Sequence, residues 1–319
     1  MNTPFYKQIW FLGGLAALVI FALCFIAIDY VGKPDEPKKP DVEMAVIATM
    51  QTNAPLIELA RQQGWIEPDA TEMTSVDALE VDSIGTVFAG SNLQSFSEFR
   101  HFVCVEEIKA GAFAGAAKLK DIVIPAGVIT IENGAFADCP SLEAISVDTA
   151  NTHYDSREEC NGIVCTWKGK LMLVAGCKNT KLIDRVHYIA PQAFAGCTGL
   201  TSIDFPERME EIGEEAFRGC TGLTEVAIPQ GVRFVEPRTF MGCTALKRLT
   251  LSKSVERLQQ QAFSGCTALT EIVSPKKFAP IIEEAFDAHT ATVYVPKGQQ
   301  NAYFRDKVWK LFKDYKELP

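Results

Sequence analysis

Histidine is scarce in this chain, and the motifs that usually mark an enzyme do not occur. The four histidines among 319 residues lie far apart, at His101, His153, His187 and His289. The sequence contains no nucleophile elbow, glycine-rich phosphate loop or H-E-x-x-H motif. It therefore predicts no enzyme activity, no catalytic residues and no cofactor.

A basic stripe with interleaved aromatic residues is also lacking. The chain has 31 Lys and Arg against 40 Asp and Glu, which gives a net charge of −9. Such a chain repels a nucleic-acid backbone on balance, so we expect no nucleic-acid partner. The 47% of apolar residues suits a well-packed body.

What the sequence does contain is a repeat marked by phenylalanine. The spacing is 23 residues throughout, except for one gap of 58, which equals one repeat plus 35 inserted residues. Self-similarity at this period predicts a solenoid of stacked repeats. The marker residues are Phe113, Phe136, Phe194, Phe217, Phe240, Phe263 and Phe286.

Each repeat carries the same apolar skeleton around its Phe. An L-x-x-I-x-I segment follows the Phe and shows the period-two alternation of a short strand. Proline ends three of these strands. The A-F-x-G-C segment is predicted to form a tight helical or 3₁₀ turn. A further apolar position lies five residues before each Phe, at Ile108, Ile131, Ile189, Ile212, Val235, Leu258 and Ile281.

This pattern resembles the leucine-rich repeats of the BspA-like class, found in bacterial surface proteins and some protist ones. The resemblance covers roughly residues 84–315. It includes S-F-S-E-F-R-H-F from Ser95, D-S-R-E-E-C-N-G-I-V from Asp155, G-C-K-N-T from Gly176 and V-Y-V-P-K-G from Val293. It implies an α/β leucine-rich-repeat solenoid of short strands and helical turns.

Relatives in this class often carry a calcium-binding loop before the first of these segments. The corresponding stretch here is Gly64–Glu72, where Ile66, Pro68 and Ala70 stand in place of oxygen ligands. Calcium needs six to eight oxygens, so we expect no metal site.

The N-terminus contains a long apolar run. Residues 9–28 carry no formal charge and are long enough to cross a bilayer as a helix. We expect an uncleaved signal anchor, because a cleaved signal peptide has a shorter apolar core and small residues at its cut site. One transmembrane helix would then precede the solenoid.

Two signals bear on the orientation of this anchor, and they disagree. Lysines after the run (Lys33, Lys38 and Lys39) outnumber Lys7 before it, which by itself predicts a cytoplasmic body. The family resemblance implies export instead. We expect an extracytoplasmic solenoid, at the cell surface or in the periplasm, and leave the cytoplasmic orientation open.

The sequence thus divides into five regions. Solenoids need caps because an uncovered end exposes core and strand edges, and Tyr303, Trp309 and Phe312 are expected to pack over the last rung. The regions are the anchor (1–29), a charged Pro-rich tether (30–42), an N-terminal cap region (43–103), the solenoid (104–292, with an insertion near 149–183) and a C-terminal cap (293–319).

The ten cysteines do not form the paired C-x-x-C hooks of a zinc site. The insertion holds Cys160, Cys165 and Cys177, and a disulfide between Cys160 and Cys177 is left open. Most repeats have a cysteine at one fixed position, and the first repeat has Ala116 there. This predicts that the position takes small, buried side chains. This cysteine slot lies three residues after the Phe, at Cys139, Cys197, Cys220, Cys243 and Cys266.

The residues between the buried strand positions should point outward and line up as one sheet face. We expect a membrane-anchored, non-catalytic binding module that recognises a protein or peptide, with a glycan possible, through this face. The alternative is a structural or assembly scaffold of the cell envelope or of the inner membrane face. The expected partner-binding residues are Asp121, Glu143, Ser146, Ser202, Asp204, Glu225, Lys247, Arg248, Thr250 and Glu271.

Overall fold

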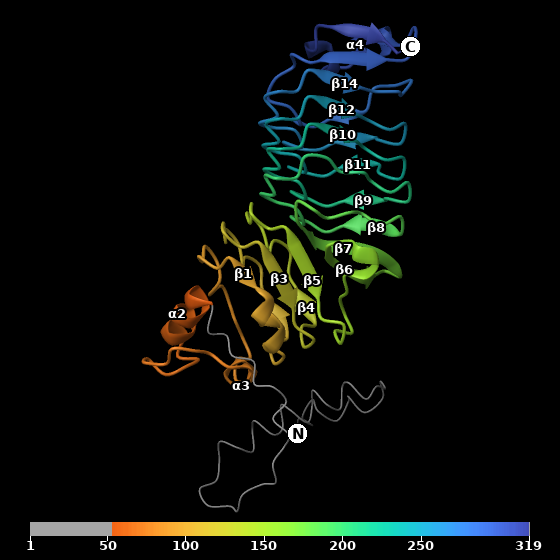
Figure 1. Ribbon diagram of the computed structural model, residues 1–319. Coiled ribbons are helices and arrows are strands. Elements are labelled where there is room, and N and C mark those ends of the chain that lie inside the picture. Colours follow the sequence, from red (N-terminus) through yellow and green to blue (C-terminus); the bar gives the residue numbers. More distant parts are fainter. Residues whose placement is uncertain (1–52, 319) are drawn as a thin grey trace, which may run out of the picture.

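The computed structural model describes residues 53–318 and shows a stack of short rungs. Figure 1 follows the stack from helix α2 (Ala54–Gln63) at one end to helix α4 (Gln300–Phe304) at the other. The predicted anchor, the tether and residues 43–52 of the predicted cap region lie outside the described residues. Within residues 53–318, no helix is long and apolar enough to cross a bilayer.

Two parallel sheets are built mainly from the L-x-x-I-x-I segments, and we call their outward side the front face. The first sheet contains β1 (Ser95–Phe96), β3 (Asp121–Ile124) and β5 (Ala144–Val147). The second contains β10 (Glu225–Ala227), β12 (Arg248–Thr250), β14 (Glu271–Val273), β16 (Thr292–Val295) and β17 (Tyr315–Glu317).

Shorter strands on the opposite side of each rung carry the apolar residue that precedes the Phe, and we call their outward side the back face. They are β2 (Glu107–Ile108) with β4 (Thr130–Ile131), β8 (Val186–Ile189) with β9 (Glu211–Ile212), and β11 (Phe234–Val235) with β13 (Arg257–Leu258) and β15 (Ile281–Ile282). The insertion adds β6 (Gly162–Trp167) and β7 (Lys170–Gly176), which pair antiparallel.

The prediction of helical turns at the A-F-x-G-C segments is wrong. The described helices, α2, α4, α3 (Ser75–Leu79) and the 3₁₀ helices Ser97–His101, Arg157–Glu159 and Trp309–Leu311, all lie outside these segments. Each segment is instead a run of turns, because the residue two before the Phe takes a positive φ, such as 56° at Glu215, which breaks a right-handed helix.

The amides that a helix would have used internally bond to the next rung instead. Phe217 N donates to Thr239 O at 2.8 Å, and Gly219 N donates to Met241 O at 2.7 Å. The turns therefore form a third layer of rung-to-rung hydrogen bonds beside the front and back strands.

The marker Phe rings form a stacked column inside the turns. Neighbouring rings lie nearly parallel with centroids 5.0 to 5.5 Å apart from Phe194 to Phe286. A second segment of the column runs through Phe113 and Phe136 and gains one ring that the 23-residue spacing did not reveal, Phe88, 5.3 Å from Phe113. Offset stacking adds to the burial energy of each ring.

The cysteine slot is buried as predicted at Cys139, Cys197, Cys220 and Cys243 and half-buried at Cys266, and it also provides a hydrogen bond. Cys220 Sγ donates to Phe194 O at 3.2 Å, and Cys243 Sγ donates to Phe217 O at 3.2 Å. Burial raises the pKa of the Cys139, Cys197 and Cys266 thiols to about 12. These thiols stay protonated at neutral pH and act as small donors inside the core.

The β6–β7 hairpin separates the interior into two cores. Val164 and Leu173 face the core of the C-terminal rungs, whereas Ile163 and Val174 face the core of the N-terminal rungs. Figure 1 shows the strands of the N-terminal rungs tilted relative to those of the C-terminal rungs, with β6 and β7 between them. The insertion is therefore an internal wall of the solenoid and not a surface loop.

The same division explains the thiols of the insertion. Cys160 packs into the C-terminal core and Cys177 into the N-terminal core, and both are free thiols. Each has its own partner: Cys160 Sγ donates to Gly162 O at 3.4 Å, and Cys177 Sγ accepts from Asn161 Nδ2 at 3.3 Å.

The side-chain amide of Asn161 bonds to the backbone at the edge of β5, where a neighbouring strand would otherwise bond. Its Oδ1 accepts from Ile145 N at 2.9 Å and its Nδ2 donates to Glu143 O at 2.7 Å. The side-chain amide thus satisfies backbone groups that the next front strand would otherwise bond. This pairing ends the first front sheet at β5.

In the last rung the strand pairing between β13 and β15 is shifted by one residue, which the repeat pattern did not predict. Ile282, not Ile281, pairs with Leu258 and is buried, while Ile281 is 51% exposed. Beyond this rung, the Tyr303, Trp309 and Phe312 side chains are fully buried. Trp309 Nε1 donates to Pro280 O at 2.6 Å, which fixes the last segment to the rung.

We expect Phe240→Ala to lower the free energy of unfolding by about 3–5 kcal/mol, because the buried ring stacks against Phe217 and Phe263. Denaturant unfolding measures this change. Phe278→Ala, at a ring that is 66% exposed, is the control and should change stability by less than about 1 kcal/mol. An unchanged unfolding midpoint for Phe240→Ala would contradict the stacked column.

We expect Asn161→Gly to destabilise the chain by about 1–3 kcal/mol, because it leaves the edge of β5 without its partner amide. Glycine tolerates the φ of 52° at this position, so the change tests the side chain and not the backbone. Amide hydrogen exchange should accelerate at Ile145. Unchanged protection there, or an equal effect from Asn92→Gly at an exposed loop position, would show that Asn161 does not complete the edge.

Candidate binding surface

The C-terminal front sheet aligns charged residues in a row. Glu225, Arg248 and Glu271 are register partners on β10, β12 and β14. Strand neighbours are about 4.8 Å apart, so these side chains form one continuous row. Arg248 Nη1 donates to Glu271 Oε2 at 3.0 Å, whereas Glu225 is exposed at the start of the row.

A second row runs beside the first and is less charged. Ala227, Thr250 and Val273 are register partners, and Tyr294 follows on β16. Val273 is buried, whereas Thr250 and Tyr294 are half-buried. The two rows together present charged groups beside small and apolar ones.

The remaining predicted residues do not join this surface. The sequence prediction of a strand at Thr201–Phe205 is wrong: the segment is irregular, and its Ser202 and Asp204 side chains are exposed. Because Asn161 occupies the edge of β5 and Lys178 N donates to Leu142 O just before it, residues 201–205 have no strand to pair with on that side. The expected single face is therefore interrupted.

On the N-terminal side of the interruption, two predicted residues lie on the first front sheet. Asp121 accepts a hydrogen bond from Ser95 Oγ at 2.5 Å, and Ser146 is an exposed register partner of Val123. They belong to a different sheet from Glu225, so one short ligand lying along the second sheet would not reach both sets.

Glu143 is already engaged within the molecule. Lys178 Nζ donates to Glu143 Oε1 at 2.6 Å, and this hydrogen bond holds the pKa of the Glu143 carboxyl below its usual range. The pair links the N-terminal rungs to the insertion. Of the ten predicted residues, the structure brings together Glu225, Lys247, Arg248, Thr250 and Glu271, all on or directly beside β10, β12 and β14.

The back face holds aromatic residues that the front-face reasoning missed. Trp167 and Tyr188 meet edge to face at 5.0 Å, and Phe234 is 38% exposed on β11. Cations lie against two of these rings: Lys168 Nζ is 3.7 Å from the centre of the Trp167 ring, and the Arg233 guanidinium is 5.3 Å from that of Phe234. Tyr188 and Phe234 both stand six residues before a marker Phe, so aligning that position across the repeats would have found them.

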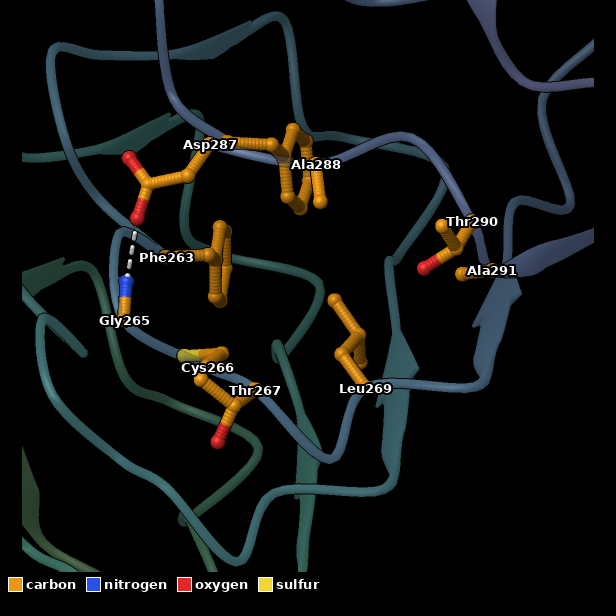
Figure 2. A pocket seen from close by; sticks show the side chains of 10 residues that line it. Phe263, Gly265, Cys266, Thr267, Leu269, Asp287, Ala288, Thr290 and Ala291 are labelled. Atoms are coloured by element: carbon orange, nitrogen blue, oxygen red, sulfur yellow. Dashed lines mark hydrogen bonds between the residues drawn. The ribbon is translucent and has the colours of Figure 1, made fainter.

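The cavity in Figure 2 is too small for an organic ligand. It measures about 80 Å³ and lies between Phe263, Cys266 and Leu269 on one side and Ala288 and Ala291 on the other. Among residues 53–318, no group of three or more His, Cys, Asp or Glu side chains could hold a metal ion. The absence of catalysis and of cofactors stays a prediction.

The last turn beside this cavity shows how the repeat ends. Asp287 Oδ2 accepts from Gly265 N at 2.7 Å, as the dashed line in Figure 2 shows. In the preceding rungs the equivalent glycine amide donates to a backbone carbonyl, as Gly242 N does to Ser264 O. A carboxylate thus replaces the missing backbone acceptor.

A model of the BspA type leucine rich repeat region matches residues 80–158 and 175–292, in six copies. No curated protein sequence matches the chain.

Three solved structures illustrate the similarity in fold. The pneumococcal vaccine antigen PcpA is 18% identical over 68% of this chain and 66% of its own, with a TM-score of 0.51. A leucine rich cell surface protein from Faecalibacterium prausnitzii A2-165 is 22% identical over 65% of each chain, with a TM-score of 0.41. A leucine-rich repeat protein from Eubacterium ventriosum ATCC 27560 is 21% identical over 59% of this chain and 55% of its own, with a TM-score of 0.43.

The match spans less than two thirds of the length of each of these three structures. At these identities the similarity concerns the fold alone.

Proposed function

Because the chain belongs to the BspA-type leucine-rich repeat family, we propose that it is a non-catalytic binding module that recognises a protein partner through the front face of its C-terminal rungs. The observation that carries this proposal is the register of Glu225, Arg248 and Glu271 on adjacent strands. A row of side chains at fixed spacing on a rigid sheet suits an extended ligand.

The charges of this row favour a protein ligand over a glycan. Arg248 and Glu271 form an ion pair with side chains 49% and 36% exposed, and such surface pairs contribute only about 0–1 kcal/mol. Either partner can therefore exchange its contact for a charge on a ligand at small cost. The front rows hold Tyr294 as their one aromatic side chain from β10 to β16, which gives little area for sugar stacking.

We further propose that residues 9–28 anchor the protein in a membrane, with residues 30–42 as a tether and the solenoid on the extracytoplasmic side. The uncharged run and the Pro-rich charged segment after it support this arrangement. The alternative is a scaffold of the envelope or of the inner membrane face. In that case the stack of rungs would act as a spacer between other proteins of the complex, and the front face would bind no ligand.

We expect a photo-crosslinking amino acid at Ala227, which is exposed beside Glu225, to yield a covalent adduct with a partner protein in living cells. The reversals Glu225→Lys and Arg248→Glu should abolish the adduct and leave the unfolding midpoint unchanged. The crosslinker at Ala117, an exposed position of the N-terminal rungs, is the control. An adduct that survives both reversals, or that forms equally from Ala117, would favour the scaffold.

We expect external protease to cleave the solenoid of a C-terminally tagged protein in intact cells or after the outer envelope is opened. The tag is followed by immunoblotting, with a cytoplasmic protein as the control for lysis. Protection that ends only on full lysis would place the solenoid in the cytoplasm and contradict the proposed orientation.

A further inference from the structure

The last rung breaks a column that every earlier rung keeps. The residue eight positions before the marker Phe is apolar in all seven repeats, and in the first six it is at most 1% exposed. Those six residues are Val105, Val128, Val186, Met209, Val232 and Val255. The seventh is Phe278, and 66% of it is exposed.

The cause is the one-residue shift in the pairing of β15. Phe234 pairs with Arg257 at a spacing of 23 residues, but Arg257 pairs with Ile281 at a spacing of 24. The residue that follows Phe278, Ala279, packs against the core, and Phe278 itself lies outside. The shift also exposes Ile281, so two large apolar side chains are displayed by one change.

The segment that displays Phe278 is held at several points. Tyr303 OH donates to Lys276 O at 3.1 Å, and Trp309 Nε1 donates to Pro280 O at 2.6 Å. Lys276 Nζ also donates to Val255 O in the preceding rung. These bonds hold the backbone on both sides of Phe278, so little backbone entropy is lost when the exposed ring binds a partner.

A groove lies beside this segment and is lined by positive charge. It measures about 690 Å³, and its walls include Lys253, Lys276, Lys277, Lys297 and Phe278. Glu256, the one carboxylate of the groove, accepts two hydrogen bonds from Arg233, at 2.8 and 2.9 Å, and is thereby neutralised. The groove thus joins four ammonium groups to an exposed aromatic ring.

The groove lies in the part of the chain where the charge changes sign. Residues 247–319 carry 12 Lys and Arg against 8 Asp and Glu, although the whole chain carries 31 against 40. The remaining residues therefore hold 19 basic and 32 acidic side chains. An acidic ligand is repelled by most of the molecule and attracted to this end.

We propose that this groove binds an acidic, extended segment of a partner protein, with an apolar side chain of that segment against Phe278. The lysines would meet its carboxylates, and the groove walls formed by Pro275, Pro280 and Pro296 would contact its apolar parts. Apart from its lysines and the engaged Glu256, the groove has one hydrogen-bonding side chain, Gln299, which is few for the hydroxyl groups of a neutral glycan. A lipid bilayer has a flat surface and would not fill this groove, which also argues against a membrane as its ligand.

The test uses fluorescence anisotropy with the full-length protein and a labelled synthetic peptide in which Asp and Glu flank a central Leu-Phe pair. The comparison peptide carries Asn and Gln in place of the acids. We expect the acidic peptide to bind at least about tenfold more tightly than its neutral counterpart. Its affinity should fall with rising salt.

Two changes in the groove should weaken this binding without unfolding the protein. Phe278→Ala should raise the Kd about tenfold, and Lys277→Ser combined with Lys297→Ser should raise it similarly and reduce its salt dependence. Phe304→Ala, at a ring 45% exposed outside the groove, and Lys118→Ser with Lys120→Ser in the N-terminal rungs are the matched controls. These controls should leave the Kd unchanged.

Several outcomes would overturn the proposal. Equal binding of the acidic and neutral peptides would do so, as would an unchanged Kd for Phe278→Ala. Binding of heparin or of phosphatidylglycerol vesicles that the groove variants abolish, with no binding of the acidic peptide, would assign the groove to a glycan or a membrane. Self-association that the same variants abolish would assign it to a second copy. The front-face reversals at Glu225 and Arg248 should not change peptide binding, so the two surfaces are tested separately.

Discussion

The structure depends on the vertical register between successive rungs. A rung of this size cannot bury its own apolar residues, so each one is stable only when its Phe stacks on the next Phe and its turn amides bond to the next turn. These contacts require that equivalent residues stay aligned. Every surface described for this protein, including the charged front row, is a consequence of that alignment.

Two places break the register, and both have structural consequences. The β6–β7 hairpin divides the front sheet and the Phe column, whereas the turns stay bonded across it through Asp138 N and Ala195 O. It also satisfies the edge of β5 through Asn161 and starts a new set of back strands through β8. The shift at β15 interrupts the register at the end of the stack, where Tyr303 and Trp309 then cover the core. The front face is divided by the first break, and two apolar side chains, Phe278 and Ile281, are exposed by the second.

Much of the fold could be predicted from the sequence because the period of the repeat and the alternation within it directly indicate stacked rungs and short strands. The 23-residue period indicated the stack, and the L-x-x-I-x-I alternation correctly placed Val226, Leu249 and Ile272 inside and Glu225 and Arg248 outside. The turns were harder to predict, because the residue two before the Phe is Glu, Arg or Gln in five repeats and these residues rarely adopt positive φ. Ser202 and Asp204 fit the strand pattern, but the strand that should have paired with them is covered by a side-chain amide from the insertion. No local pattern reports such a contact, and the same is true of the one-residue shift that exposes Phe278.

The internal wall has a consequence for how such a chain can change its length. Because the hairpin presents one apolar face to each core, the buried apolar residues on its two sides form separate clusters, and the turns of the two sides are joined by Asp138 N and Ala195 O at 2.8 Å. A duplication or deletion of 23 residues on one side would lengthen or shorten that arm and leave the other arm, and both outer ends, intact. The wall thus gives the molecule two separately adjustable arms from one continuous chain, so that the spacing between its ends can evolve without a new fold.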